Sequence, residues 1–449
     1  MKLAYFIRAS LLILMISSLG LTWAIWTLPN KVENRNNLNG NKTETNTTLR
    51  ENDVFSPFQL VYHDEAVAKS TTNADLLNRV EKELDSWRFT NIQDYRVLGD
   101  SYSAKLNEAN TLELVYPVAR PFMTITNSFQ KLASNYKNQK FQRILIPLND
   151  SKEVYFFNDT TATMYSSEIE GFNKKDLLDM LDSSERPLVE VNLQKLAERY
   201  VYLPKEAVGL SKLTYISELK PSIDIRNRLF DDLSEITSST SQDKNFEQYY
   251  DNVSKVSINK ETHILTYNRS STSVKMNMQD VLKYSLSELQ DFDIWPGRTR
   301  FFQYDEGKQQ VIYRRYIEGL PIFGDGNLEH DFGATYLTIT KDGTLSRLQI
   351  PLNVAQTPIY SKMTEKKLAS GSELLAYLVT LGYQANEIED IQLGYAWTTA
   401  SDSGAIENGA NADKIVEFVP SWYMLIKGNW YNVAELSAKD EEGNRDNGL

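Results

Sequence analysis

The chain has 449 residues and carries 60 acidic against 48 basic side chains, a formal net charge of −12. A chain of this length is too long to fold around a single hydrophobic core, so we predict two or three domains. The excess of acidic residues argues against nucleic acid as a partner. No cysteine is present, which excludes disulfides, thiol catalysis and cysteine-based zinc sites.

The first element is an apolar stretch over 10–28 without a charged residue. A helix needs about 20 mostly apolar residues to cross a bilayer core. Trp23 and Trp26 lie near its outer end, where aromatic rings favour the headgroup level. The bulky residues after Leu21 do not fit a signal-peptidase site, which requires small residues. We therefore predict an uncleaved transmembrane anchor and short cytoplasmic tail over 1–29, with the bulk of the chain outside the cytoplasm.

A polar segment rich in Asn and Thr follows and predicts a flexible linker over 30–53. A first α+β domain is expected over 54–181. It begins with a strand-like run over 54–62. A helix capped by Thr72 or Asn73 follows, and its apolar residues up to Trp87 recur at helical spacing. Further strands are predicted at 94–98, 111–116, 141–147, 153–157 and 161–165, with a helix at 125–136. The alternation over 111–116 is typical of a half-buried strand.

The middle domain is predicted over 182–293. The pattern over 174–233 is mixed and partly helical. A turn at 259–262 separates strand-like runs at 254–258 and 263–267, which predicts a hairpin. A helix is expected over 278–289, with its apolar residues on one side.

The C-terminal domain, 294–437, has the clearest pattern. Hairpins are predicted at 301–304 with 310–317 and at 334–340 with 344–350. A helix at 365–381 and strands at 414–419, 422–427 and 430–433 follow, and 438–449 is expected to be disordered. The fold class is therefore α+β: a single N-terminal membrane helix, then antiparallel sheets with covering helices.

No catalytic, metal or cofactor site emerges from the residues. His63, His263 and His330 have no ligand spacing and are expected to be structural. The oxygen-rich loop at 325–331 lacks the full calcium-loop pattern and suits a turn. Glu168 and Glu170 resemble a glycosidase pair only superficially and fit a solvated face. Aromatic residues that suggest glycan stacking are better explained by core packing: Tyr249, Tyr250, Trp295, Trp422 and Trp430.

Two segments together suggest a family. Residues 18–27 read SLGLTWAIWT inside the anchor, and residues 311–323 read VIYRRYIEGLPIF. The chain resembles the YycH regulatory family of monoderm bacteria. That resemblance implies a non-enzymatic, membrane-anchored accessory protein of the WalK/YycG sensor histidine kinase, acting with a YycI-like partner on cell-wall metabolism. It also implies a C-terminal domain similar to YycI and, loosely, to PepSY modules, and no cofactor.

The anchor itself carries small residues suited to helix packing. Gly20 and Ala24 are four residues apart, and Ser17 lies one turn before Gly20. Small residues at this spacing let helix backbones approach closely, although they occur in most membrane helices. The predicted partner-binding residues are Ser17, Gly20, Thr22, Trp23, Ala24 and Trp26. Two alternatives stay open: a wall-glycan-binding or hydrolytic ectodomain, and an extracytoplasmic chaperone or protease inhibitor.

Overall fold

The computed structural model describes residues 49, 51–65, 67–84, 86–95, 101–149, 151–182, 188–240, 245–270, 276–295, 298–324, 330–340, 342–360, 363–399 and 415–436. The predicted anchor, with all six of its proposed partner-binding residues, and the predicted tail at 438–449 lie outside these ranges. Within the ranges, no helix combines the length and the apolar character that crossing a membrane requires. All described residues belong to one unit, 48–449.

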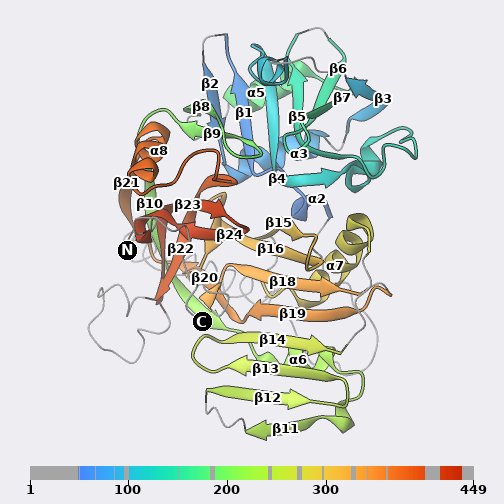
Figure 1. Cartoon of the computed structure of the whole chain (residues 1–449), viewed down its shortest axis with the longest axis vertical. Coiled ribbons are helices and arrows are strands. Elements are labelled where there is room, and N and C mark those ends of the chain that lie inside the picture. Colours follow the sequence, from blue (N-terminus) through green and yellow to red (C-terminus); the bar gives the residue numbers. More distant parts are fainter. Residues whose placement is uncertain are drawn as a thin grey trace, which may run out of the picture. The chain divides into compact units, whose positions relative to one another are not determined.

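Nine antiparallel strands form the first sheet, in the order β3-β7-β6-β5-β4-β1-β2-β8-β9 (Figure 1). Their bounds are β1 (Gln59–His63), β2 (Ala68–Thr71), β3 (Arg88–Tyr95), β4 (Thr111–Pro121), β5 (Lys140–Pro147), β6 (Glu153–Asn158), β7 (Thr163–Glu170), β8 (Val189–Lys195) and β9 (Tyr200–Pro204). The strands predicted at 111–116, 141–147 and 153–157 are confirmed. The strand-like run predicted over 54–62 is a strand only from Gln59 onward. Those predicted at 94–98 and 161–165 are displaced relative to β3 and β7.

Helices cover both faces of this sheet. The predicted helix after Asn73 is confirmed as α3 (Ala74–Leu84), and the Asn73 carboxamide accepts the Leu76 amide at 3.1 Å. The apolar residues of α3 share a core with α5 (Lys174–Asp182) and with Ile144 and Ile146 of β5. Leu145 points to the opposite face, where it packs with residues of α4 (Ser101–Leu106). Because both faces are covered, β4 is buried along most of its length. The strand predicted at 111–116 is therefore present, but its predicted half-burial is wrong.

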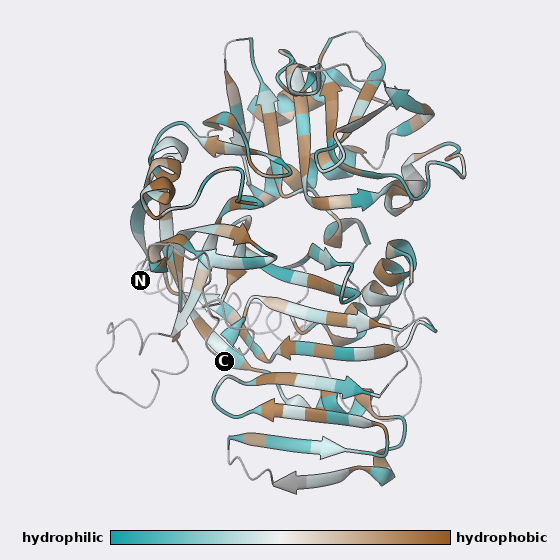
Figure 2. Cartoon of the chain, in the orientation of Figure 1, coloured by the Kyte–Doolittle hydropathy of each residue, from teal (hydrophilic) through white to brown (hydrophobic). Residues whose placement is uncertain are grey.

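The second sheet has fifteen strands, from β10 to β24, and Figure 2 shows hydrophobic segments along many of them. The first eight are β10 (Val208–Leu219), β11 (Thr237–Thr240), β12 (Phe246–Tyr250), β13 (Ser254–Asn259), β14 (Ile264–Arg269), β15 (Thr299–Asp305), β16 (Gln310–Ile317) and β17 (Leu320–Phe323). The others are β18 (Ala334–Ile339), β19 (Leu345–Pro351), β20 (Asn353–Pro358), β21 (Thr364–Leu368), β22 (Asp390–Thr399), β23 (Ile415–Ile426) and β24 (Asn429–Asn432).

Three predicted hairpins in this sheet are confirmed: β13 with β14, β15 with β16, and β18 with β19. The helix predicted at 278–289 is confirmed as α7 (Met278–Phe292), whose apolar residues share a core with β13 to β16, β18 and β19. Strands of the predicted middle and C-terminal domains share this core, since β14 pairs with β19. The boundary at 293/294 stays a prediction.

Three predicted elements need correction, and a fourth stretch is now resolved into its elements. The helix expected at 125–136 is a 3-10 turn, η1 (Phe122–Ser128), followed by turns. The helix expected at 365–381 is divided: β21 pairs with β10, and only α8 (Gly371–Thr380) is helical. The strands expected at 414–419 and 422–427 are the single strand β23. The partly helical stretch at 174–233 contains three strands, β8 to β10, besides α5 and α6 (Ser222–Leu229).

Candidate functional site

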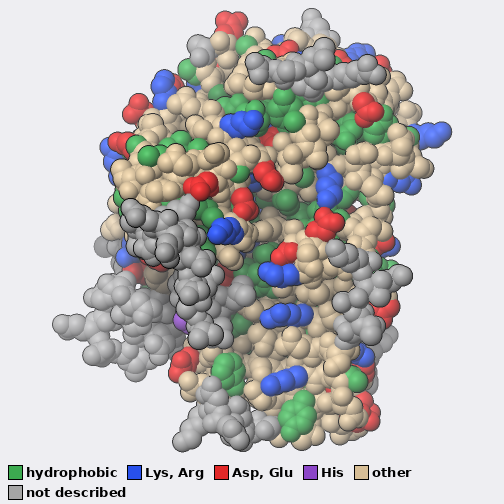
Figure 3. All heavy atoms as spheres, in the orientation of Figure 1, with side chains coloured by type: hydrophobic (Ala, Val, Ile, Leu, Met, Phe, Trp, Pro, Cys, Tyr) green, Lys and Arg blue, Asp and Glu red, His purple; other side chains and the backbone are tan. Residues whose placement is uncertain are grey.

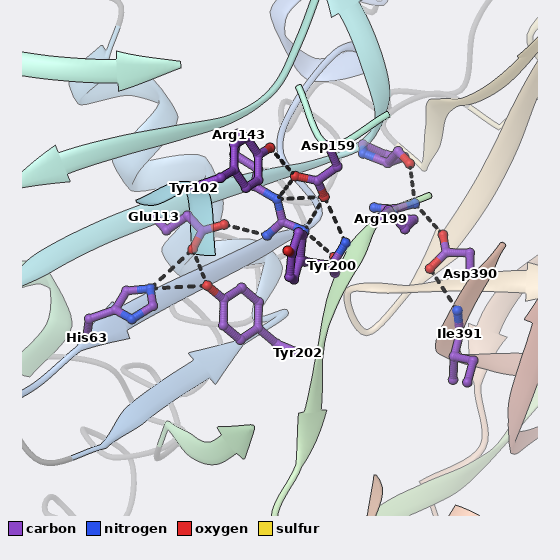
Figure 4. A network of polar contacts seen from close by, with 11 residues as sticks. His63, Tyr102, Glu113, Arg143, Asp159, Arg199, Tyr200, Tyr202, Asp390 and Ile391 are labelled. Atoms are coloured by element: carbon purple, nitrogen blue, oxygen red, sulfur yellow. Dashed lines mark hydrogen bonds and ion pairs between the residues drawn. The ribbon is translucent and has the colours of Figure 1, made fainter. Parts of the chain in front are cut away.

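A network of buried charged residues connects strands β1, β4, β5 and β9 of the first sheet (Figure 4). The Arg143 guanidinium on β5 donates to both carboxylate oxygens of Asp159, through Nε at 3.0 Å to each and through Nη2 at 2.8 Å. Its other nitrogen donates to Glu113 on β4, and Nη2 also donates to the Tyr200 carbonyl. Asp159 accepts the Tyr102 hydroxyl at 2.6 Å and the Tyr200 amide at 3.0 Å. One guanidinium therefore joins residues of β4, β5 and β9.

The second carboxylate oxygen of Glu113 continues this network toward β1. It lies 3.1 Å from Nε2 of His63 and accepts the Tyr202 hydroxyl. His63 is 3% exposed, so it is buried, and its ring packs edge-on against Tyr202 with centroids 5.8 Å apart. Each carboxylate oxygen of Glu113 and Asp159 thus has a hydrogen-bond partner, and the network is suited to holding strands together.

Opposing effects set the charge states of this network. Burial alone would raise the pKa of Glu113, but the Arg143 guanidinium and His63 outweigh it and lower that pKa. The pKa of Asp159 is lowered in the same way, chiefly by Arg143. Burial tends to lower the pKa of Arg143, but Asp159 and Glu113 raise it well above its ordinary value. Both carboxylates and the guanidinium therefore stay ionised.

A second ion pair joins the two sheets next to this network. Arg199, in the turn before β9, forms an ion pair with Asp390 at the start of β22 and donates to the Pro117 carbonyl at 3.0 Å. When the Gln142 carboxamide is oriented so that its oxygen faces Arg199, that oxygen accepts from Nη2 and Nε of Arg199 at 2.7 and 3.2 Å. Asp390 also accepts the Ile391 amide at 2.8 Å. Burial raises the pKa of Asp390 to about 6, although Arg199 opposes this effect.

The segment that leads from the predicted linker into β1 packs in the core of the second sheet. This lead-in segment consists of residues 49 and 51–58 and contains the short helix α2 (Glu51–Val54). Leu49, Val54 and Phe55 are buried against the core that includes α7, and Gln290 of α7 donates to the Leu49 carbonyl at 2.7 Å. Ordered chain therefore begins before residue 54, within the stretch predicted as a flexible linker over 30–53.

Two buried arginines hold the lead-in segment from both sheets. Arg120, at the end of β4, donates to the Phe55 carbonyl, and its guanidinium lies 5.1 Å from the Phe55 ring centroid. Arg300 of β15 donates to the Pro57 carbonyl at 3.4 Å. Burial lowers the pKa of both arginines. Phe58 then packs against apolar residues of both sheets. The first described residues of the chain are thus held by both sheets.

A cleft of about 610 Å³ opens beside the Arg199–Asp390 pair. Its walls come from the first sheet, through β2 and β9, and from the second sheet, through β10, β17 and β22. Arg199, Glu318 and Asp390 are the charged residues that line it. Its volume falls within the range of about 300–1,000 Å³ that is typical of ligand sites. On the face in view in Figure 3, acidic and basic side chains are interspersed.

The other residues weighed in the sequence have separate places. His263 lies in the turn before β14 with φ 55°, and Glu168 and Glu170 are exposed on β7. Trp422 and Trp430 pack in apolar clusters, as core packing predicts. The loop at 325–329 lies outside the described residues. Among the residues that are described, no group of three or more His, Asp or Glu is placed to hold a metal ion.

Sequence reasoning missed the charge network, although a signal for it exists. Glu113 stands between Leu112 and Leu114, and Arg143 stands one residue before the apolar run 144–146. A single charge inside an apolar strand indicates a buried, paired group, because unpaired buried charges are rare. The pairing itself needs the strand order, since the two residues are 30 positions apart.

Comparisons with known proteins agree with this architecture. The family described as YycH protein, N-terminal domain, matches residues 7–186, and the YycH protein, C-terminal domain, matches residues 198–441. No curated protein matches the chain. The crystal structure of YycH from Bacillus subtilis is similar, with a TM-score of 0.70 and 18% identity, over 87% of this chain and 98% of that chain. At this identity the likeness shows the fold. Because the two family domains together span most of its length, the chain belongs to the YycH family.

Proposed function

We propose that this chain is a membrane-anchored accessory regulator of a WalK/YycG-type sensor histidine kinase. It acts with a YycI-like partner, through contacts of its membrane helix and its ectodomain, and thereby affects cell-wall metabolism. The observation that carries the proposal is family membership across both halves of the chain, over residues 7–186 and 198–441. The proposal includes the YycI-like, loosely PepSY-like character of 294–437 and the position of the folded region outside the cytoplasm.

Regulation of this kind requires the chain to prefer one state of the kinase. A partner that binds all states equally shifts no equilibrium, however tightly it binds. The lead-in segment supports a physical route for such a preference. The carbonyls of Phe55 and Pro57 accept hydrogen bonds from Arg120 and Arg300 on the two sheets, so a displacement carried along this segment would act on both sheets.

The proposed helix contact is tested by replacing Gly20 and Ala24 with Ile. Bulky side chains on this face prevent close approach of a second helix. We expect association with the kinase to fall in a membrane two-hybrid assay, and target-gene output to change. Ser18→Ile is the matched control, because Ser18 lies on the opposite face of a helix from Gly20. Unchanged association and unchanged output in the Gly20→Ile/Ala24→Ile variant would remove this interface.

A further inference from the structure

The cleft beside Arg199 and Asp390 is bordered by the edge of β22, which includes Ile391 and Leu393. On β22, the Ile391 amide donates to the Asp390 carboxylate and not to β23, although Ile391 lies opposite Met424 of β23. Backbone groups alternate in direction along an antiparallel strand. The N–H and C=O of Leu393 therefore also point away from β23.

Further along β22 this same edge is used for pairing. Tyr395 and Ala396 pair in parallel with Ile322 and Phe323 of β17. β17 begins at Leu320, and within the described chain no strand pairs with β22 on this side at Ile391 or Leu393. The edge of β22 is thus half occupied, and its empty half faces the cleft.

The opposite wall is the edge of β9, and at Tyr200 this edge is already occupied. The Tyr200 amide donates to Asp159 and its carbonyl accepts from Arg143, both of which belong to the buried charge network. The open strand edge in this cleft is therefore that of β22.

Unpaired backbone groups at such a position are unusual. Ile391 is 3% exposed, yet its carbonyl has no strand partner in the described part of the chain. Buried N–H and C=O groups are nearly always paired, and an open strand edge is a template for another extended segment. The side chains that flank the edge include Leu210, Leu320 and Met363, which suit apolar side chains on such a segment.

The charges of the cleft restrict its occupant. One cation, Arg199, stands against two carboxylates, Glu318 and Asp390, and Arg199 already forms an ion pair with Asp390. An acidic peptide would meet no unpaired cation here, whereas a neutral or basic peptide meets a compatible surface.

We propose that this cleft binds an extended peptide segment of neutral or positive charge, which adds as a strand to the edge of β22 at Ile391 and Leu393. Backbone hydrogen bonds supply affinity in this mode, and the apolar residues of the cleft select alternate side chains. The proposal concerns a ligand of the folded region and does not depend on the kinase contact.

Panning a phage-displayed library of random heptapeptides against the purified full-length chain tests this site. We expect enriched peptides to be poor in Asp and Glu. Leu393→Pro removes the backbone N–H that faces the cleft, so peptide affinity should fall about tenfold or more. The pairing of β22 with β23 should persist, because β23 does not bond this N–H. Leu393→Ala is the matched control: it retains the amide and should change the affinity about threefold or less. Circular dichroism melting checks that both variants fold.

A second variant tests the same site without a proline, in case Leu393→Pro fails to fold. The chain has no cysteine, so Gln392→Cys places a unique thiol in the cleft wall. A bulky maleimide at this position should abolish binding of the enriched peptides. The same label on Val379→Cys, at an exposed position of α8, should leave binding unchanged. Absence of any enriched peptide, or binding that survives the label at position 392, would overturn the proposal.

Discussion

At the scale of single residues, the first sheet contains a few buried charges that satisfy one another. Arg143 is fully buried and bonds two carboxylates, Glu113 of β4 and Asp159 in the turn after β6. A buried ion pair adds little net stability over apolar residues of the same shape, but breaking one is costly because the remaining charge is unpaired. The effect of a substitution therefore depends on which charges it leaves behind.

Arg143→Met is expected to destabilise the fold by about 3–5 kcal/mol, because Glu113 and Asp159 remain buried without their cation. Equilibrium unfolding in urea measures this change. Combining Arg143→Met with Glu113→Gln and Asp159→Asn removes the unpaired charges and should restore part of the stability. A loss below about 1 kcal/mol for Arg143→Met alone would contradict the assigned role of the network.

Asp390 should give the stability of the protein a distinct pH dependence. Its folded-state pKa is raised to about 6 from 3.8, so between these values the folded state holds a proton that the unfolded state has released. This contribution to stability is present below pH 3.8 and is lost as the pH rises through about 6. The difference is on the order of 1–3 kcal/mol.

Urea unfolding midpoints of the natural chain and of Asp390→Asn, measured from pH 4 to 7.5, isolate this effect. The natural chain should lose stability relative to the variant as the pH rises, because asparagine does not titrate. The Asn side-chain oxygen still accepts the Ile391 amide, so the start of β22 is retained. Parallel pH profiles for the two proteins would show that Asp390 is ionised across this range.

At the scale of elements, local patterns predicted hairpins and amphipathic helices well and failed where distant strands decide the structure. The hairpin of β15 and β16 is encoded by a short turn, and α7 by its apolar spacing. In contrast, 364–368 has residues that fit a helix but forms β21, because β10 lies beside it. The helix start itself was readable: Ser370 and Glu373 form a capping box.

Pro420 explains another error at this scale. A proline inside a strand argues against a continuous strand, because proline has no amide to donate. In β23, however, pairing with β10 ends at Phe418 and pairing with β24 begins at Tyr423. Pro420 lies in the interval, so its missing N–H costs no hydrogen bond to a third strand.

The packing of the lead-in segment predicts that it stabilises α7 more than α3. Val54 is fully buried in the core of α7, although it precedes the first sheet in sequence. Val54→Ala should therefore increase amide hydrogen exchange in α7 more than in α3. Leu76→Ala, in the core of the first sheet, is the matched control and should affect α3 first. Equal or reversed effects on the two helices would contradict the packing of this segment.

At the scale of the whole molecule, two features connect the two sheets: the lead-in segment and one ion pair. The lead-in segment is held by Arg120 from the first sheet and by Arg300 from the second. The ion pair of Arg199 with Asp390 joins the sheets a second time, at the cleft. Residues 18–27 and 311–323 were enough to indicate the family, which is confirmed. The cleft and the charge network could not be predicted from the sequence, because they depend on which distant strands pair.

The most direct test of the proposed regulator is site-specific photocrosslinking of the full-length chain in native membranes. A photoreactive residue placed at Gly20 or Ala24 should attach to a sensor histidine kinase, and one placed at Ser18 should attach far less. Mass spectrometry of the product identifies both the partner and the first residue of the mature chain. Attachment to lipid alone at Gly20 and Ala24, or a mature chain that begins after Asn30, would contradict the account.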